Sequence, residues 1–200
     1  MRALLCSLIV ASVACGGNDA GPTGPITAHA THYDLTLDLD TRAAHSKVAL
    51  VADVAGDCMT LPFRADSLTA VAFDGKPGDG TQNADNTLTI CGDGVEAGKP
   101  FTVEADDTVP LKTLETSQVG FSISNDVDGN KLAYLVSWVN GCDQFGPCDN
   151  RPDQFATYTF DVAHGADTIV RCPGTITDKS PTETICDFAF DGGPTYSTFG

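Results

Sequence analysis

The stretch Gly141–Phe160, GCDQFGPCDNRPDQFATYTF, decides the fold of this 200-residue chain. It holds two cysteines six residues apart and then an Asn-Arg-Pro turn. Pro152 fixes its own φ angle and holds Arg151 in an extended conformation. Beyond the turn, β-branched and aromatic residues alternate with others, which is typical of a strand. The stretch therefore predicts a turn that ends one strand and sets the direction of the next.

The rest of the chain carries the same signal. His32–Asp40 alternates most clearly, with Tyr33 and three leucines on one face and polar residues on the other. Runs of helix-forming residues at helical spacing are missing, and Gly and Asp fill the gaps. The sequence predicts an all-β fold, an antiparallel sandwich or saddle. The expected strands are His32–Asp40, Lys47–Val54, Cys58–Phe63, Leu68–Phe73, Thr87–Cys91, Phe101–Ala105, Val119–Ser124, Leu132–Trp138, Phe155–Ala163, Thr168–Cys172, Glu183–Phe190 and Tyr196–Phe199.

The N-terminus has the features of an export signal. A basic start precedes the apolar run Ala3–Ala11, which is too short to span a bilayer as a stable helix. Ser12-Val13-Ala14-Cys15 resembles a bacterial lipobox, so we expect a signal peptide at 1–14 and a lipidated Cys15. An ordinary signal peptide cleaved near Ala14 is the alternative. Residues 15–27 are expected to form a flexible tether and residues 28–200 one domain. We therefore expect the protein to be exported and to be anchored to a membrane as a lipoprotein, either in the periplasm or at the cell surface.

The remaining cysteines favour disulfides over a zinc site. Once the signal peptide and Cys15 are set aside, six remain, and none forms a Cys-x2-Cys pair. Six cysteines allow 15 pairings, so spacing alone does not decide between them. Turn signals between Cys172 and Cys186 predict a hairpin that pairs the strands Thr168–Cys172 and Glu183–Phe190 and brings these two cysteines together. The short loop between Cys142 and Cys148 can close on itself. The pairs we expect are Cys58–Cys91, Cys142–Cys148 and Cys172–Cys186.

Several segments resemble, in the correct order, the N-terminal domain of the aminopeptidase N family of zinc metallopeptidases. The Pro-Cys motif of that family is matched by Pro147, Cys148, Asp149, Arg151 and Pro152, and a strand follows it. The other similar segments are His32–Asp40, Ala97–Val103, Gly120–Trp138 and Pro194–Phe199. The resemblance therefore covers roughly residues 28–200, the whole predicted domain.

The resemblance implies a non-catalytic β domain that packs on a catalytic domain and walls the peptide-substrate cleft. Counting back from Pro147 places Trp138 at or near the position where the family contacts the substrate amine, with Val136 as its neighbour. An indole there could offer a cation–π contact, although a tryptophan of the core or rim is the simpler interpretation. The family's His-Glu-x-x-His and Gly-x-Met-Glu-Asn motifs are missing from this sequence. We expect no catalytic residues here, no peptidase activity from this chain alone, and zinc only in a catalytic domain outside it.

A stand-alone secreted β-sandwich that binds a partner or a surface glycan is the alternative function. Asp126–Asn130 resembles half of a calcium loop, but the twelfth position is Ser137, so a hairpin turn is the better interpretation. Asp106-Asp107, and Asp143 together with Asp149 and Asp153, are interpreted as a solvated acidic face rather than a cation site. The net charge of −16 argues against nucleic acid as a partner. The expected partners are a catalytic aminopeptidase domain or a peptide substrate, with the membrane reached only through the lipid.

Overall fold

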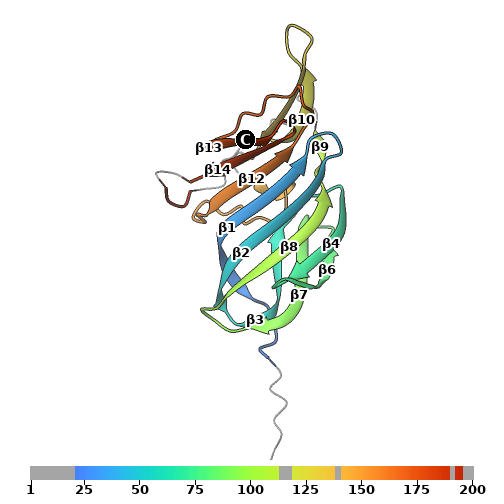
Figure 1. The fold of residues 1–200 in the computed structure, drawn as a ribbon. Helices are drawn as coiled ribbons and strands as arrows, with labels where there is room; N and C mark the ends of the chain where they lie inside the picture. Colours follow the sequence, from blue (N-terminus) through green and yellow to red (C-terminus); the bar gives the residue numbers. More distant parts are fainter. Residues whose placement is uncertain (1–20, 113–118, 138–140, 190–191, 196–200) are drawn as a thin grey trace, which may run out of the picture.

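The computed structural model describes residues 21–112, 119–137, 141–189 and 192–195, and it confirms an all-β fold (Figure 1). An eight-stranded sheet runs in the order β13-β14-β12-β1-β2-β8-β4-β5. Neighbouring strands are antiparallel, except that β1 and β12 run parallel. The strands are β1 (Thr27–Asp38), β2 (Ala43–Val54), β4 (Ser67–Phe73), β5 (Lys76–Pro77), β8 (Pro100–Thr108), β12 (Thr157–Ala163), β13 (Thr175–Ser180) and β14 (Glu183–Phe188).

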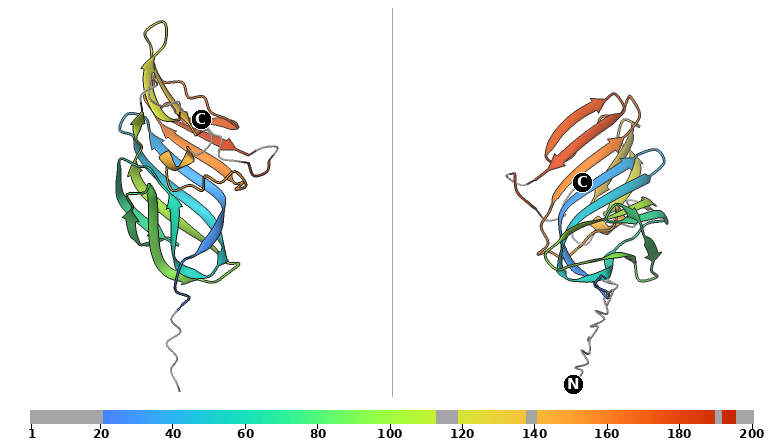
Figure 2. Two further views of the ribbon diagram at one scale, coloured as in Figure 1. Left: turned by 180° about the vertical axis from the view of Figure 1, so that it is seen from behind. Right: turned by 60° about the horizontal axis from the view of Figure 1, so that its bottom comes forward.

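Two smaller sheets accompany the large one. One has the order β3-β7-β6, with β3 at Gly56–Pro62, β7 at Thr87–Val95 and β6 at Asp79–Gln82. The other has the order β11-β10-β9, with β9 at Leu111–Lys112, β10 at Gly120–Asn125 and β11 at Lys131–Val136. They lie at opposite ends of the molecule (Figures 1 and 2). A short 3-10 helix, η1 (Cys142–Gln144), follows β11, and no described helix is long and apolar enough to cross a bilayer.

Side-chain alternation divides the large sheet into a core face and a solvent face. Leu35, Val48 and Val103 are buried from three adjacent strands. The opposite face is polar, and Lys47 bonds to Glu104 across the ladder at 2.9 Å. A register shift between Ala30 and His32 lets both Ala30 and Tyr33 face the core, although their positions differ by an odd number. The alternation in the sequence therefore correctly predicts which face is buried.

Two predicted boundaries need correction, and one predicted strand lies outside the described residues. Thr168–Cys172 is not a strand; β13 begins only at Thr175, after Pro173 and Gly174, where Gly174 has a φ of +86°. The chain is already packed before residue 28, because the Ile26 amide donates to the Cys58 carbonyl and the Ile26 side chain is buried. The expected strand Tyr196–Phe199 lies outside the described residues.

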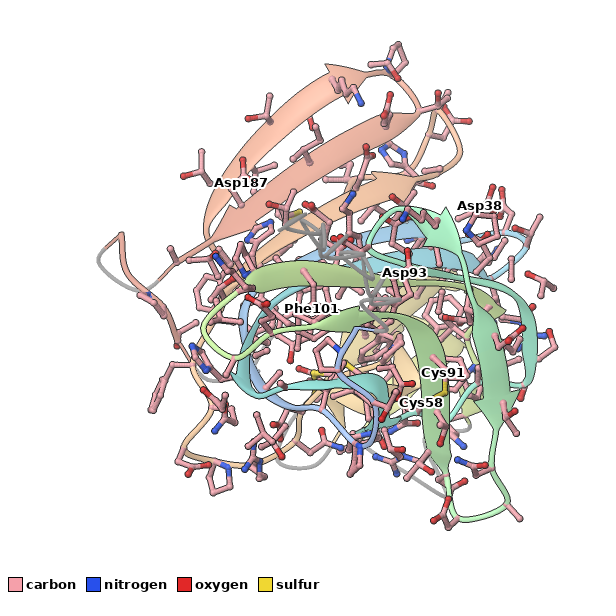
Figure 3. All side chains as sticks on the ribbon, turned by 90° about the horizontal axis from the view of Figure 1, so that it is seen from below. Asp38, Cys58, Cys91, Asp93, Phe101 and Asp187 are labelled. Atoms are coloured by element: carbon pink, nitrogen blue, oxygen red, sulfur yellow. A yellow bond between two sulfur atoms is a disulfide. The ribbon has the colours of Figure 1, made fainter. Side chains whose placement is uncertain are left out.

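Disulfides join Cys58 to Cys91, Cys142 to Cys148 and Cys172 to Cys186, the pairs expected from the sequence. Cys58 and Cys91 lie directly opposite one another on β3 and β7, with their Cα atoms 4.1 Å apart (Figure 3). Cys172, by contrast, lies in the irregular segment before β13 and reaches Cys186 of β14 from outside the hairpin. The strand pairing assumed for this third bridge is therefore wrong, although the pair itself is present.

We expect the Cys58–Cys91 bridge to stabilise the domain more than the Cys142–Cys148 bridge. The two bridges close loops of 33 and 6 residues. In the chain-entropy model these loops correspond to about 4 and about 2 kcal/mol. Urea unfolding of the Cys58→Ala/Cys91→Ala and Cys142→Ala/Cys148→Ala proteins measures the difference. A larger loss from the second pair would show that burial of the Gly141–Pro152 segment outweighs loop closure.

Candidate functional site

The first eight residues of the Gly141–Pro152 segment are buried although most of the segment is irregular. Every residue from Gly141 to Cys148 is buried. A buried loop needs partners for its backbone groups, and β3 supplies one, because the Cys148 amide donates to the Pro62 carbonyl at 3.1 Å. The segment therefore fills part of the interior beside the large sheet rather than covering the surface.

Arg64 and Asp143 form the strongest charged contact of this segment. The Arg64 guanidinium holds both oxygens of the Asp143 carboxylate, with Nε 2.6 Å from Oδ2, and the Arg64 amide donates to the Asp143 carbonyl at 2.7 Å. The Asp143 side chain is only 5% exposed. This corrects the interpretation of Asp143 as part of a solvated acidic face. The sequence offered only a weak signal for this pair, an arginine just after an apolar strand.

Gly146 allows the segment to approach the large sheet closely. Its φ is +151°, and a Cβ at this position would lie 2.6 Å from Cβ and Oγ of the buried Ser46 on β2. Real side chains do not tolerate such a contact, and the backbone angle also favours glycine. Gly120 of β10 plays a comparable role, because a Cβ there would meet Oε1 of Gln144. These glycines set the distance between the segment and its neighbours.

The family-motif residues are mainly structural. Pro147 and Cys148 are buried, whereas Pro152 is exposed. The Asp149 amide donates to the Tyr33 hydroxyl at 3.2 Å, and its carboxylate accepts from Arg151, with Nε at 3.0 Å. Tyr33 itself stacks on Tyr158 at 5.1 Å, and burial raises the pKa of Tyr33 well above its usual range. The motif thus ties the loop to the two parallel strands β1 and β12.

The β10–β11 hairpin, Gly120–Val136, precedes this segment and projects from the molecule (Figure 1). Its base is buried through Phe121 and Ser122, whereas Ile123, Val127 and Leu132 are exposed. Asp126 closes the turn by accepting from the Asn130 amide at 2.8 Å, so this is a hairpin turn and not a calcium loop. The substrate-contact candidate Trp138 lies outside the described residues, two positions beyond the end of β11.

No zinc or calcium site fits the part of the chain that the structure describes. It holds no cluster of three or more His, Cys, Asp or Glu residues that could bind a metal ion. Asp106 and Asp107 do not act together, since alternation along β8 turns Asp106 toward His45 and buries Asp107 on the opposite face.

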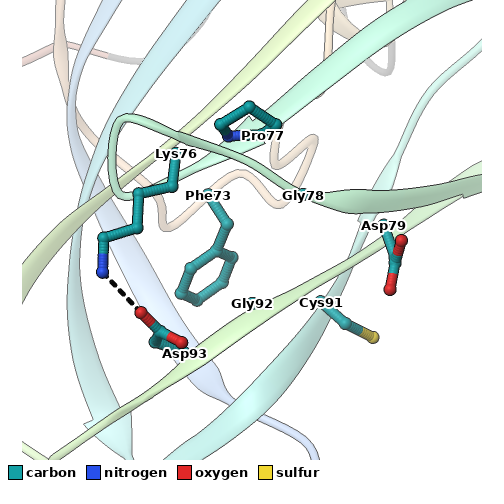
Figure 4. Close-up of a pocket in the computed structure, with 8 residues that line it drawn as sticks. All are labelled: Phe73, Lys76, Pro77, Gly78, Asp79, Cys91, Gly92 and Asp93. Carbon is teal, nitrogen blue, oxygen red and sulfur yellow. Dashed lines mark hydrogen bonds and ion pairs between the residues drawn. The ribbon is translucent and has the colours of Figure 1, made fainter.

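A small pocket of about 280 Å³ lies beside the β4–β5 turn (Figure 4). Phe73 forms its floor, and Gly78 and Gly92 lie close to that ring. Lys76 and Asp93 bond across it at 2.5 Å, and both side chains are largely exposed. The Lys76–Asp93 ion pair uses the one cation that lines the pocket, which leaves Asp79 as the remaining charged lining residue.

The fold is similar to solved zinc metallopeptidases. The M1 zinc metallopeptidase from Deinococcus radiodurans superposes with a TM-score of 0.62 and 19% identity over 80% of this chain. A mutant of the same enzyme bound to a Tyr-Ser-Ala substrate gives 0.63, and a two-domain M1 zinc metallopeptidase mutant bound to L-tryptophan also gives 0.63, both at 19% identity. The sequence matches no family model and no curated protein.

These comparisons show the fold. This chain has the architecture of an M1 aminopeptidase N-terminal-like domain, as the sequence resemblance predicted. It covers 38% or 39% of the length of the solved structures named above, so most of each metallopeptidase has no counterpart in it.

Proposed function

We propose that this chain is a non-catalytic β domain that packs on the catalytic domain of a zinc metallopeptidase and walls one side of its peptide-substrate cleft. The observation that carries the proposal is the structural similarity to M1 zinc metallopeptidases. One of the similar structures is a two-domain M1 zinc metallopeptidase, in which a domain with this fold is accompanied by a second one. Zinc and the peptide-cleaving residues would belong to the catalytic domain. Pro147, Cys148, Asp149, Arg151 and Pro152 would shape the segment behind the cleft rather than touch the substrate.

The β10–β11 hairpin is the part of this domain that we assign to the contact. Ile123 and Leu132 lie on opposite faces of the hairpin, because Ile123 is paired with Ala133 and Leu132 with Ser124. Both are exposed although they are large and apolar, and burying them against a partner would be favourable. Trp138 follows β11 closely in sequence and remains the proposed cleft contact.

Titration calorimetry between this chain and a separately produced M1 catalytic domain from the same organism tests the proposal. Ile123→Asp and Leu132→Asp each place a charge on one hairpin face, and at least one should weaken binding more than about tenfold, as expected when a charge is buried unpaired. Phe155→Asp is the matched control, since Phe155 is equally exposed but lies outside the hairpin. Failure of the two proteins to associate would favour the alternative, a stand-alone secreted binding module.

The purified chain should show no zinc-dependent release of amino acids from amide substrates. The described residues contain no metal-binding cluster, and the sequence contains no His-Glu-x-x-His. The measurement is hydrolysis of an aminoacyl amide with and without added zinc. Chelator-sensitive turnover by the pure chain would contradict this expectation.

We further propose that the domain is exported and held at a membrane by a lipid on Cys15. The support is the lipobox-like Ser12-Val13-Ala14-Cys15 and the even number of cysteines that remain. Cys15→Ser should move the protein from the detergent phase to the aqueous phase, or block its processing. Ala14→Gly keeps a small residue and is the control. Membrane partitioning of the Cys15→Ser protein would contradict the lipid anchor.

A further inference from the structure

A second pocket lies at the edge of the large sheet that is formed by β13 and β14. Its volume is about 440 Å³, in the range of small-molecule sites. One wall is the irregular segment that begins at His164 and ends at Arg171, and the other is the β13–β14 hairpin. The Cys172–Cys186 disulfide anchors the end of the irregular segment to β14. The two walls are thus held together covalently next to the pocket.

The pocket contains an arginine and an aspartate that do not pair with each other. The Arg171 guanidinium donates to the neighbouring Val170 carbonyl at 2.8 Å, and it forms no ion pair within the described ranges. This is notable in a protein whose formal net charge is −16, where cations have many possible partners. Because no carboxylate of the described residues binds it, the Arg171 guanidinium can still donate its N–H groups to the carboxylate of a ligand.

A hydrogen bond from the β14 residue Thr184 holds the Asp178 carboxylate in place. The buried Thr184 hydroxyl donates to Asp178 Oδ1 at 3.2 Å, and His164 Nε2 lies 2.9 Å from the same hydroxyl oxygen. His164 Nδ1 also lies 2.9 Å from the Gly165 carbonyl, so this ring bridges the Thr184 hydroxyl and the backbone of the irregular segment. The contacts orient the carboxylate and use one of its two oxygens. Like Arg171, Asp178 forms no ion pair in the part of the chain that the structure describes.

The pocket also has an apolar side formed by Ile169, Val170 and Pro181. Ile169 is 74% exposed, one of the most exposed large apolar side chains among the described residues. A ligand that covers this side chain removes apolar surface from water, which favours binding. The pocket therefore offers a cation, an anion and an apolar surface to one small molecule.

We propose that this pocket binds a small zwitterion with an apolar side chain, such as a free aliphatic amino acid. The ligand carboxylate pairs with Arg171, its ammonium group with Asp178, and its side chain contacts Ile169. A simple anion would meet the Asp178 carboxylate unfavourably, and a simple cation would meet Arg171. Only a molecule with both charges satisfies both residues. This site is independent of the proposed contact with a catalytic domain.

Nuclear magnetic resonance titration of the complete chain with L-leucine tests the proposal. We expect saturable shifts of backbone signals from residues 164–171 and 178–184. Two analogues of L-leucine test the two charged groups one at a time. 4-Methylpentanoate lacks the ammonium group, and leucinamide lacks the carboxylate. Each should bind at least about tenfold more weakly, because a charged hydrogen-bonding group is left unpaired. Equal binding of L-leucine and 4-methylpentanoate would overturn the zwitterion proposal.

Two variants complete the test. Arg171→Gln should weaken L-leucine binding at least about tenfold while leaving the thermal unfolding midpoint unchanged, since this side chain is exposed. Lys99→Gln is the matched control, because Lys99 also forms no ion pair within the described residues and does not line the pocket. Absence of saturable shifts, or an equal loss in both variants, would rule out the site.

Discussion

Replacing Arg64 by methionine should lower the free energy of unfolding by about 1–3 kcal/mol, the cost expected when a buried carboxylate loses its hydrogen-bond donors. The substitution keeps an apolar chain of similar length but leaves the Asp143 carboxylate, which is only 5% exposed, without its guanidinium. Urea unfolding at neutral pH measures the loss. The structural reason is that Asp143 lies in the buried part of the Gly141–Pro152 segment, where the Arg64 guanidinium donates to both of its carboxylate oxygens.

Two controls distinguish this effect from a general loss of charge. Lys76→Met breaks the exposed pair with Asp93 and should change the free energy of unfolding far less. The double variant Arg64→Met/Asp143→Asn removes the buried charge as well, and should recover part of the stability. A single variant as stable as the original protein would mean that Asp143 reaches solvent, and the segment would not be the buried element described above.

Replacing Asp107 by asparagine should stabilise the protein at pH 8 and change its stability little at pH 4. Asp107 is 4% exposed, and neither of its carboxylate oxygens has a hydrogen-bond partner among the described residues. Burial, with a smaller contribution from Asp106, raises the pKa of Asp107 to about 7. A shift of about three units corresponds to roughly 4 kcal/mol, and we expect about 1–3 kcal/mol because asparagine also buries unpaired polar atoms.

The direction of the pH dependence follows from proton binding. The folded state holds the Asp107 proton more tightly than the unfolded state, whose pKa is near 4. The contribution to stability is therefore fully present below about pH 4 and is lost as the pH rises through about 7. Urea unfolding between pH 4 and pH 8 should show this slope in the original protein and not in Asp107→Asn. Asp128→Asn, at an exposed carboxylate in the turn of the β10–β11 hairpin, is the control. An unchanged slope in Asp107→Asn would contradict the assignment.

Regular alternation made most of the large sheet predictable from sequence. His32–Asp40 and Lys47–Val54 each show one apolar face, and these faces are the buried ones in β1 and β2. The strands β5, β6 and β9 could not be found this way, because two to four residues are too few to show a period. Thr168–Cys172 was misjudged for a related reason. Its composition suits a strand, but Pro173 and Gly174 place the strand start beyond it.

The candidate site was less predictable than the fold. The Pro-Cys motif lies in the Gly141–Pro152 segment, but the packing of that segment depends on residues far away in sequence, namely Ser46, Arg64 and Tyr33. No local sequence pattern predicts contacts between residues so far apart in the chain. The same holds for Asp107, whose environment depends on which face of β8 is buried and on what covers that face. Trp138 remains a prediction, since it lies outside the described residues.

The parallel pairing of β1 with β12 has a consequence for how the chain folds. Tyr33 aligns with Tyr158, so β1 stays an open edge until more than 120 further residues have been added. Pairing over such a sequence distance is slow, because a long loop must close before its contacts form. An unpaired, alternating strand is also a template for association with other chains. A chain crossing a membrane in the unfolded state would therefore be most prone to aggregation just before Thr157 emerges, and fragments that end before β12 should associate rather than remain monomeric.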